Sequence, residues 1–244
     1  MEDTAKIKER IIEIISKINP SISSESVFNL CEKHVALLME ENKKFNLTSI
    51  KDKAGGLERH ILDSILLMHL GSEYFSSSNS VLDIGSGGGY PGIPMGIIFP
   101  EKTIMLLEST RKKVAFLEQV IREMGLENIK VLCGRAEDFA REKNFRGAFD
   151  LVVSRALAKL PVVIELSIPF LKIGGFSIAM KGKSSEKEIK LSENALTKLN
   201  AIWVEIIPYS LISPYDLRLV IMKKIAETPI HYPRKPGIPQ KKPL

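Results

Sequence analysis

Two kinds of hydrophobic pattern follow one another along the chain. Residues 1–70 place apolar side chains at helical spacing, and in the stretch from Glu25 to Lys43 they recur at spacings of three and four. Beyond residue 80, short and fully apolar runs alternate with helical stretches such as Arg111–Met124. Runs of this kind are typical of a parallel sheet that is covered by helices on both faces. The pattern predicts an α/β fold with a mostly parallel, twisted sheet, preceded by an N-terminal helical segment.

The apolar runs are the expected strands. Those expected in the parallel part are Val81–Ile84, Thr103–Leu107, Ile129–Leu132, Leu151–Val153 and Phe176–Met180. Two later runs, Ile202–Ile207 and Leu217–Ile225, are expected to pair as a hairpin at the sheet edge. The segment SEYFSSSN, residues 72–79, predicts a polar break ahead of the first strand. The capping-box pattern Ser185-x-x-Glu188 predicts a helix over 185–199.

These elements divide the chain into three parts of one integrated unit. We expect residues 1–70 to form a helical cap, residues 71–227 the sheet domain, and residues 228–244 a tail. The tail carries four Lys or Arg residues and no acid, in a chain of net charge +6, and this basic surplus suits a polyanionic partner. It should also be extended, because it contains Pro229, Pro233, Pro236, Pro239 and Pro243.

Composition favours an ordinary soluble globular protein, with 44% hydrophobic and 26% charged residues. The N-terminus lacks the apolar core of a signal peptide, and no window reaches the ~18 apolar residues of a membrane span. Cys31 and Cys133 lie far apart and form no CxxC motif, which argues against a zinc site or a disulfide framework. We therefore expect a cytoplasmic protein without metal or membrane, and nothing demands more than a monomer.

A glycine-rich loop is the clearest binding motif. The string VLDIGSGGGYPG, residues 81–92, runs from an apolar strand through Asp83 into Gly85 and Gly87, and helical residues begin near Pro91. Glycines allow tight turns and close approach of a ligand to the backbone, and nucleotides bind at strand ends in open α/β sheets. The loop therefore predicts a nucleotide-type cofactor.

Two cofactor classes compete for this loop. Gly87–Gly92 satisfies the dinucleotide pattern GxGxxG, but its register is late, because the third glycine position counted from Gly85 is Tyr90. The charge of Asp83 would repel phosphates, whereas it suits the ammonium and sulfonium of S-adenosylmethionine. We therefore favour S-adenosylmethionine and a Rossmann-like class I methyltransferase fold, and keep an NAD(P)-dependent oxidoreductase as an alternative. The loop residues expected at the cofactor are Asp83, Gly85, Gly87 and Tyr90.

Two further strand ends fit a bound nucleoside. Glu108 ends the second strand, where a carboxylate can accept hydrogen bonds from both ribose hydroxyls. The third strand ends near Cys133, and the residues that follow, among them Ala136 and Glu137, lie where an adenine ring would bind. Cys133 itself is expected to be a small buried residue. Both cofactor classes contain ribose and adenine, so these positions do not choose between them.

The end of the fourth strand, Ser154-Arg155-Ala156, faces the transferred methyl group in such folds. It holds neither an Asn-Pro-Pro-aromatic string for an exocyclic amine nor a Pro-Cys pair for attack on a pyrimidine ring. These absences favour an acceptor that is already nucleophilic, such as guanine nitrogen 7, and no general base. Arg155 is the expected orienting group for guanine oxygen 6, the cofactor carboxylate or a phosphate, and a structural ion pair is its alternative role.

The chain resembles the GidB family, also called RsmG, the small-subunit ribosomal RNA guanine nitrogen-7 methyltransferases, over nearly its whole length. RHILDS, residues 59–64, ahead of DIGSGGGYPGIP, residues 83–94, is the specific combination. Glu108 stands where many relatives have Asp, a change that keeps the ribose acceptor. The other matching pieces are Asn46-Leu47-Thr48, Arg111-Lys112-Lys113, Ser154-Arg155-Ala156, Met180-Lys181-Gly182 and Tyr232–Gly237.

The resemblance implies S-adenosylmethionine as cofactor and a guanine in a conserved loop of 16S rRNA as target. RNA would then be bound electrostatically, with the target base splayed from its stack. The implied cofactor contacts are Gly85, Tyr90, Ala136, Glu137 and Arg155. The expected RNA-binding residues are Lys43, Lys44, Arg59, His60, Arg111, Lys112, Lys113, Lys181, Arg234 and Lys235.

Two histidines are expected to have structural roles. His34 lies on the apolar stripe of the helix from Glu25 to Lys43, and we expect a satisfied core or boundary histidine there. His60 should form a hydrogen-bonded pair with Asp63 that braces the helical cap against the site. A third hypothesis for the whole chain also stays open: a non-catalytic RNA-binding or ribosome-assembly protein that retains the cofactor fold.

Overall fold

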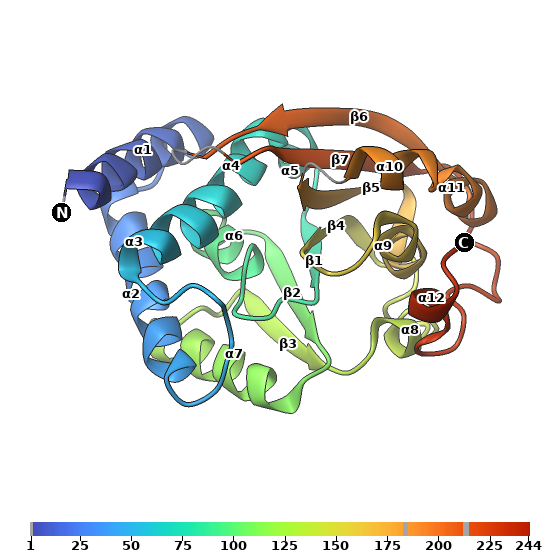
Figure 1. Cartoon of the computed structure of the whole chain (residues 1–244), viewed down its shortest axis with the longest axis horizontal. Helices are drawn as coiled ribbons and strands as arrows, with labels where there is room; N and C mark the ends of the chain where they lie inside the picture. The colour runs from blue at the N-terminus through green and yellow to red at the C-terminus, as the bar shows by residue number, and fades with distance from the viewer. Residues whose placement is uncertain (1, 183–184, 212–214) are drawn as a thin grey trace.

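The computed structural model describes residues 2–182, 185–211 and 215–244. Helical segments precede the first strand, as predicted (Figure 1). They are α1 (Glu2–Ile18), α2 (Ser24–Asn42), α3 (Lys53–Gly56), the π-helical turn η1 (Leu57–Leu62), α4 (Asp63–Leu70) and α5 (Ser72–Ser76). Helix α5 occupies the predicted polar break, and that prediction is wrong because Tyr74 and Phe75 are buried and anchor the segment to the core. Among the described helices, none has the length and apolarity that a membrane crossing requires.

A seven-stranded, mostly parallel sheet forms the centre of the molecule (Figure 1). Its strands are β1 (Ser80–Ile84), β2 (Thr103–Glu108), β3 (Ile129–Cys133), β4 (Phe149–Arg155), β5 (Leu171–Gly182), β6 (Ala201–Tyr209) and β7 (Leu217–Lys224), in the order β3-β2-β1-β4-β5-β7-β6. Strand β7 runs antiparallel to both β5 and β6, and the other neighbours are parallel. The predicted α/β fold and edge hairpin are confirmed. The dinucleotide-binding order 3-2-1-4-5-6 has no such antiparallel insertion.

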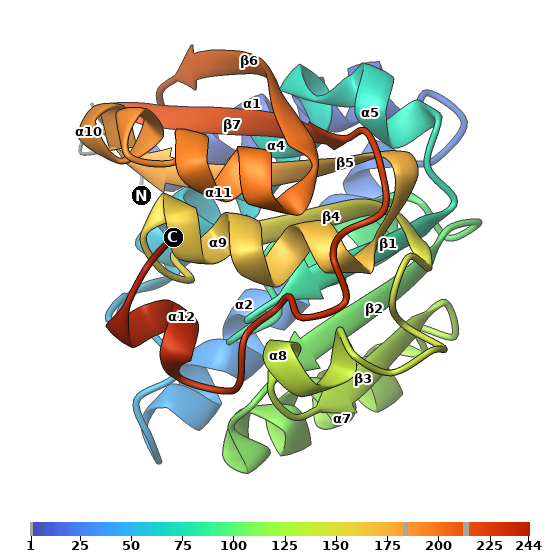
Figure 2. The ribbon, with the colours of Figure 1, turned by 90° about the vertical axis from the view of Figure 1, so that its right-hand side faces the viewer.

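The sheet is buried on both faces because alternate residues of each central strand belong to different cores. In β4, Leu151 and Val153 face one core and Val152 the other. Successive side chains of a strand point to opposite faces, so burial on both faces produces the fully apolar runs in the sequence. The helices are divided in the same way (Figures 1 and 2): the first core holds α1, α2, α4, α6 (Gly92–Ile98) and α7 (Arg111–Met124), and the second holds α8 (Ala136–Phe139), α9 (Leu160–Ser167), the 3-10 turn η2 (Ile168–Phe170) and α11 (Glu193–Leu199).

Two predictions for the C-terminal part are corrected. The expected single helix over 185–199 is two helices, α10 (Ser185–Lys190) and α11, and between them Ser192 Oγ donates to the carbonyl of Glu188. The side chain of Ser185, expected as a cap, lies outside the described residues. The tail is not wholly extended, because helix α12 (Ile238–Lys241) contains Pro239 in its first turn, where proline is tolerated.

The turn from β1 into α6 requires a glycine for steric reasons. A Cβ atom at Gly92 would lie 2.2 Å from Leu106 Cδ2 and 2.8 Å from Asp83 Oδ2. The Gly92 amide donates to the same Asp83 oxygen at 3.0 Å, which fixes the start of α6 against β1. A side chain at residue 92 would therefore push the strand ends apart at the ligand-binding edge of the sheet.

We expect Gly92→Ala to lower the free energy of unfolding by about 1–3 kcal/mol, the usual cost of forcing an extra group into a packed core. For a chain of this length, that loss lowers Tm by roughly 2–10 °C. Gly182→Ala is the matched control, because a Cβ atom there meets nothing within 4 Å. Differential scanning calorimetry that gives the same Tm for wild type and Gly92→Ala would contradict this packing.

Candidate active site

Two cavities open at the carboxyl ends of the parallel strands and meet at Gly85. The first, of ≈ 490 Å³, lies between the N-terminal helices and the ends of β1, β4 and β5. The second, of ≈ 270 Å³, lies at the ends of β1, β2 and β3, beside the C-terminal tail. The Leu157 side chain covers Gly85 between them, since a Cβ atom on this glycine would be 2.6 Å from Leu157 Cδ1. Open α/β sheets bind their ligands at this edge.

The glycine loop and Glu108 are held together as one unit. Gly85, Gly87 and Gly89 adopt left-handed conformations, with φ of 72°, 56° and 92°. The Gly87 amide donates to Glu108 Oε2 at 3.0 Å, and the Thr110 amide donates to Glu108 Oε1 at 2.8 Å. Each carboxylate oxygen has further lone pairs. Glu108 therefore keeps acceptor capacity for ribose hydroxyls while it holds the loop, but its side chain is buried and lines neither cavity.

Asp83 does not lie where the sequence analysis places it. Its side chain is completely buried beneath the loop and lines neither cavity. Oδ2 accepts the Gly92 amide, and Oδ1 has no partner among the described residues. Burial raises the pKa of Asp83 to about 7, so its negative charge is incomplete at neutral pH. This side chain supports the loop from below, so the structure gives no support to the expected contact between Asp83 and the cofactor.

The guanidinium of Arg155 joins the end of β4 to the N-terminal helices. Its Nη1 donates to the carbonyl of Arg59 at 2.7 Å and to Asp63 Oδ2 at 3.3 Å. Its Nη2 donates to His60 Nδ1 at 2.9 Å, and the group lies 5.5 Å from the centroid of the Tyr90 ring. Arg155 thus forms an ion pair with Asp63, which is the structural role that we considered as its alternative. Three of five N–H groups are used, so two are left for a ligand in the first cavity.

Arg155 stands between the two residues that were expected to pair directly. His60 accepts from Arg155, while Asp63 binds Arg155 and accepts the hydroxyl of Tyr209 at 2.7 Å. The predicted direct His60–Asp63 hydrogen bond is therefore wrong. Because His60 Nδ1 is an acceptor, Nε2 carries the proton and donates to Thr48 Oγ1 at 3.1 Å. Both residues still connect the helical segment to the site.

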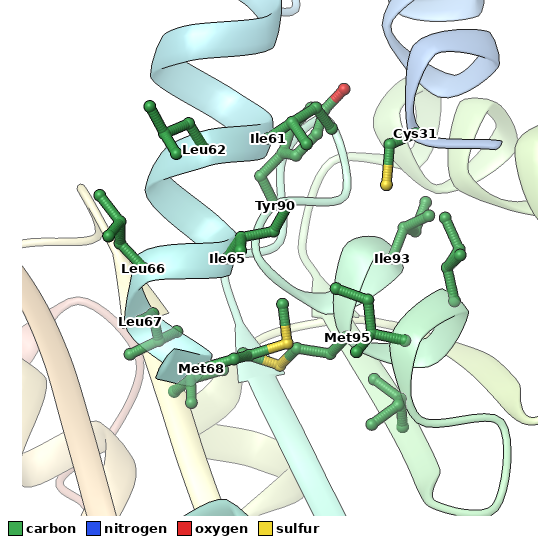
Figure 3. Close-up of a cluster of buried hydrophobic side chains, with 14 of the residues drawn as sticks. Cys31, Ile61, Leu62, Ile65, Leu66, Leu67, Met68, Tyr90, Ile93 and Met95 are labelled. Carbon is green, nitrogen blue, oxygen red and sulfur yellow. The ribbon is translucent and has the colours of Figure 1, made fainter. Parts of the chain in front are cut away.

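Three rings stack beside the first cavity. The centroids of His60 and Tyr90 lie 4.5 Å apart and those of Tyr90 and His34 lie 4.3 Å apart, with 15° between the planes in each pair. Figure 3 shows Tyr90 within the cluster of buried side chains contributed by η1, α4 and α6. Burial lowers the pKa of His34 to about 4 and that of His60 to about 3. Both rings are neutral at pH 7. His34 is in the core as we expected, with Nε2 donating to the Gly88 carbonyl at 2.8 Å, but it is only half satisfied, because its Nδ1 has no hydrogen-bond partner among the described residues.

The second cavity occupies the place where the sequence analysis puts adenine. Gly134, Ala136 and Glu137, which follow β3, line it. Glu137 Oε1 accepts the backbone amide of Gly237 at 3.0 Å, so the C-terminal tail forms part of the wall. Cys133 is exposed rather than buried as predicted, because it is the last residue of an edge strand.

The basic residues expected to bind RNA are only partly gathered at the site. Arg111 and Lys112 are exposed at the start of α7 and do not line the first cavity. Lys43 and Lys44 form exposed ion pairs with neighbouring glutamates. Those that line the first cavity are Arg59, His60, Lys113 and Lys181.

Some of these cations are already engaged. Lys181 Nζ lies 2.7 Å from Glu188 Oε2, and Arg234 Nη2 lies 2.6 Å from Oε2 of the fully buried Glu165. The guanidinium of Arg234 is therefore used within the fold and is not a free RNA contact, while Lys235 is exposed.

Two tyrosines at the first cavity carry no signal in the sequence. Tyr209, the last residue of β6, holds Asp63, and the ring of Tyr215 lies under the Arg59 guanidinium, 5.0 Å from its carbon to the ring centroid. No local pattern marks either position. The partner of Tyr209 lies 146 residues away in the chain.

The neutral state of buried His34 predicts a pH dependence of stability. Its ordinary pKa is 6.5, whereas the folded side chain is protonated only below about 4. Between these values the unfolded chain binds a proton that the folded protein does not, so stability is lost as pH falls below 6.5.

From pH 7 to pH 5, we expect the free energy of unfolding of wild type to fall about 2 kcal/mol more than that of His34→Gln. Glutamine can still donate to the Gly88 carbonyl but cannot take up a proton. Urea unfolding at the two pH values measures the difference. Equal losses in both proteins would mean that His34 is not held neutral.

Solved structures with a similar fold include methyltransferases. The O-methyltransferase TomG from Streptomyces achromogenes, in complex with SAM, is similar with a TM-score of 0.56 and 15% identity over 79% of this chain and 90% of that chain. A putative O-methyltransferase from Klebsiella pneumoniae gives a TM-score of 0.55 and 14% identity over the same shares. At these identities the likeness concerns the fold alone, and it confirms the predicted class I methyltransferase fold.

Sequence comparison is more specific. The family model described as GidB, rRNA small subunit methyltransferase G, matches residues 28–209. The ribosomal RNA small subunit methyltransferase G of Clostridium tetani is 41% identical and covers 90% of this chain and 92% of its own length. The protein of the same name from Alkaliphilus metalliredigens is 40% identical over 85% of this chain and 87% of its own. This chain belongs to the GidB family of rRNA small subunit methyltransferases G.

Proposed function

We propose that the protein transfers the methyl group of S-adenosylmethionine to nitrogen 7 of a guanine in 16S rRNA. The observation that carries the proposal is the meeting of the two cavities at Gly85. A small cavity at the nucleoside position and a larger one with basic and aromatic walls lie on either side of Gly85, which lines both. A donor molecule and an acceptor base bound in these cavities would face each other across the glycine loop.

The second cavity fits the adenosine part of the cofactor. Leu107 and Leu157 give apolar walls for a flat base, and Glu137 adds a polar edge. Glu108 would accept the ribose hydroxyls, and the backbone at Gly85 would approach the amino-acid end. The two carboxylates favour hydroxyl and amino groups over a diphosphate. Selection against a diphosphate, which we expected from the charge of Asp83, would then come from these carboxylates.

When bound, S-adenosylmethionine supplies an electrophilic methyl group. Guanine nitrogen 7 has a free lone pair at neutral pH, so the protein needs no general base. Its own contribution is to hold the base in line and to exclude water. The two remaining N–H groups of Arg155 would donate to guanine oxygen 6, which lies beside nitrogen 7 on the same edge. Neutral His60 holds the guanidinium in this position by accepting one of its hydrogens.

The mouth of the first cavity suits a nucleotide that is splayed out of an RNA loop. Lys113 and Arg59 would contact phosphates, and the exposed ring of Tyr215 offers a surface on which a base can stack. This arrangement supports RNA as the acceptor over a small molecule.

The two other hypotheses make different binding predictions. An NAD(P)-dependent oxidoreductase would bind the dinucleotide tightly in calorimetry and would not bind S-adenosylhomocysteine. A non-catalytic assembly protein would keep its role in ribosome formation after Arg155→Ala.

We expect the protein to form 7-methylguanosine when it is incubated with labelled S-adenosylmethionine and ribosomal RNA from cells that lack it. Arg155→Lys should lower the rate about 10- to 100-fold, because an ammonium cannot replace a planar fork with three partners. The control is Lys143→Gln, in the exposed loop before β4 at the opposite end of the sheet. Absence of 7-methylguanosine in free RNA, precursor particles and 30S subunits would refute the proposal.

A second prediction concerns RNA affinity. Lys113→Gln should weaken RNA binding and reduce the slope of log affinity against log salt by about 1, the effect of losing one phosphate contact. S-adenosylhomocysteine affinity should not change. Titrations of wild type and Lys113→Gln at several salt concentrations measure the slopes, with Lys143→Gln as control. Identical slopes for wild type and Lys113→Gln would exclude a phosphate contact at this residue.

A further inference from the structure

The C-terminal tail packs against the second core instead of extending into solvent. We call residues 228–244 the C-terminal strap. Figure 2 shows it in dark red, running down past α9 to α12. Arg146 holds its backbone by donating to the carbonyl of Thr228 at 2.7 Å and to that of Tyr232 at 2.8 Å, and Arg141 donates to the carbonyl of Pro233. Arginines of the preceding domain therefore attach the first part of the strap, residues 228–233.

A buried ion pair fixes the middle of the strap. Glu165 on α9 is fully buried, and it accepts both the backbone amide of Arg234 at 2.8 Å and the guanidinium at 2.6 Å. A buried carboxylate is strongly unfavourable without such partners. The fold thus depends on the strap at this point, and the residues that follow Arg234 start from a defined position.

From there the strap reaches the second cavity. The Gly237 amide donates to Glu137 Oε1 at 3.0 Å, and Gln240 lines the same cavity as Ala136 and Glu137. Gln240 is an exposed residue, and within the described part of the chain its side-chain amide has no hydrogen-bond partner, so it is available to a ligand in the cavity. The family model ends at residue 209, so these strap residues lie outside the region that it matches.

We propose that the strap completes the cofactor site: the Gln240 amide binds the edge of the adenine ring, and the Gly237 amide holds the Glu137 carboxylate beside it. This inference deepens the proposed function and rests on it, because it takes the second cavity as the adenosine subsite.

The chemistry of the two groups is complementary. The edge of adenine presents an amino donor next to a ring-nitrogen acceptor, and a glutamine amide presents one acceptor and one donor in the same plane. The Gln240 oxygen accepts from the 6-amino group, and its NH₂ donates to the neighbouring ring nitrogen. The strap therefore contributes to adenine recognition, whereas the sequence analysis assigned its basic residues to RNA.

Calorimetry with two ligands tests the proposed hydrogen bonds between the Gln240 amide and adenine. The ligands are S-adenosylhomocysteine and its purine analogue that lacks the 6-amino group. We expect Gln240→Ala to weaken S-adenosylhomocysteine binding about 5- to 10-fold, as a lost hydrogen bond of about 1 kcal/mol or more implies. The preference of wild type for the 6-amino ligand should shrink in this variant. Gln119→Ala, the same change on α7, is the control and should bind both ligands like wild type.

Four outcomes decide the inference. Retention of S-adenosylhomocysteine affinity within twofold in Gln240→Ala would overturn it, and so would an undiminished preference for the 6-amino ligand. A wild-type protein that binds no S-adenosylhomocysteine would overturn the proposed function, and this inference with it. A reduced preference, with unchanged Tm and RNA affinity, supports a direct contact with adenine over a general role of the strap in folding.

Discussion

The site depends on the planar guanidinium of Arg155. This residue ends a central strand, and its three hydrogen bonds go to Arg59, His60 and Asp63, on the π-helical turn η1 and the start of α4. A fork with five donors in a fixed plane can serve three partners at once. These bonds hold the N-terminal helices above the carboxyl ends of the strands, and the first cavity is the space between them. The π-helical turn at this point fits the tendency of such turns to occur at functional sites.

Neutral aromatic and imidazole rings complete the arrangement. Tyr90 occupies the position where a dinucleotide loop has its third glycine, and its buried ring lies between His60 and His34. Protonated histidines on both sides of this ring would repel Arg155. Because burial lowers the pKa values of His34 and His60, both rings are neutral at pH 7 and this repulsion is avoided. We propose that the choice of cofactor depends on ring packing in the loop and on Glu137, the carboxylate that lines the second cavity. It does not follow from Asp83, which is buried below them.

The strands could be predicted from the sequence because each central strand is buried on both faces and leaves an uninterrupted apolar run. Helices α5 and α12 could not be predicted in this way. Their local sequences are polar or proline-rich, and tertiary packing determines their structure, as the burial of Tyr74 does for α5. The glycine loop, Glu108 and Arg155 could be proposed as site residues from their places at strand ends, and their contacts with a cofactor stay a prediction. The direction of the Asp83 side chain and the contact of Tyr209 with Asp63 depend on tertiary packing, and no local spacing encodes them.

A crystal structure of the complex with S-adenosylhomocysteine is the most direct test of this account. We predict a ligand that passes Gly85 and reaches both cavities, with adenine beside Ala136 and the homocysteine end below Arg155. The guanidinium should keep its bonds to His60 and Asp63. A complex in which the ligand leaves the second cavity empty, or in which Arg155 has left both partners, would contradict the account.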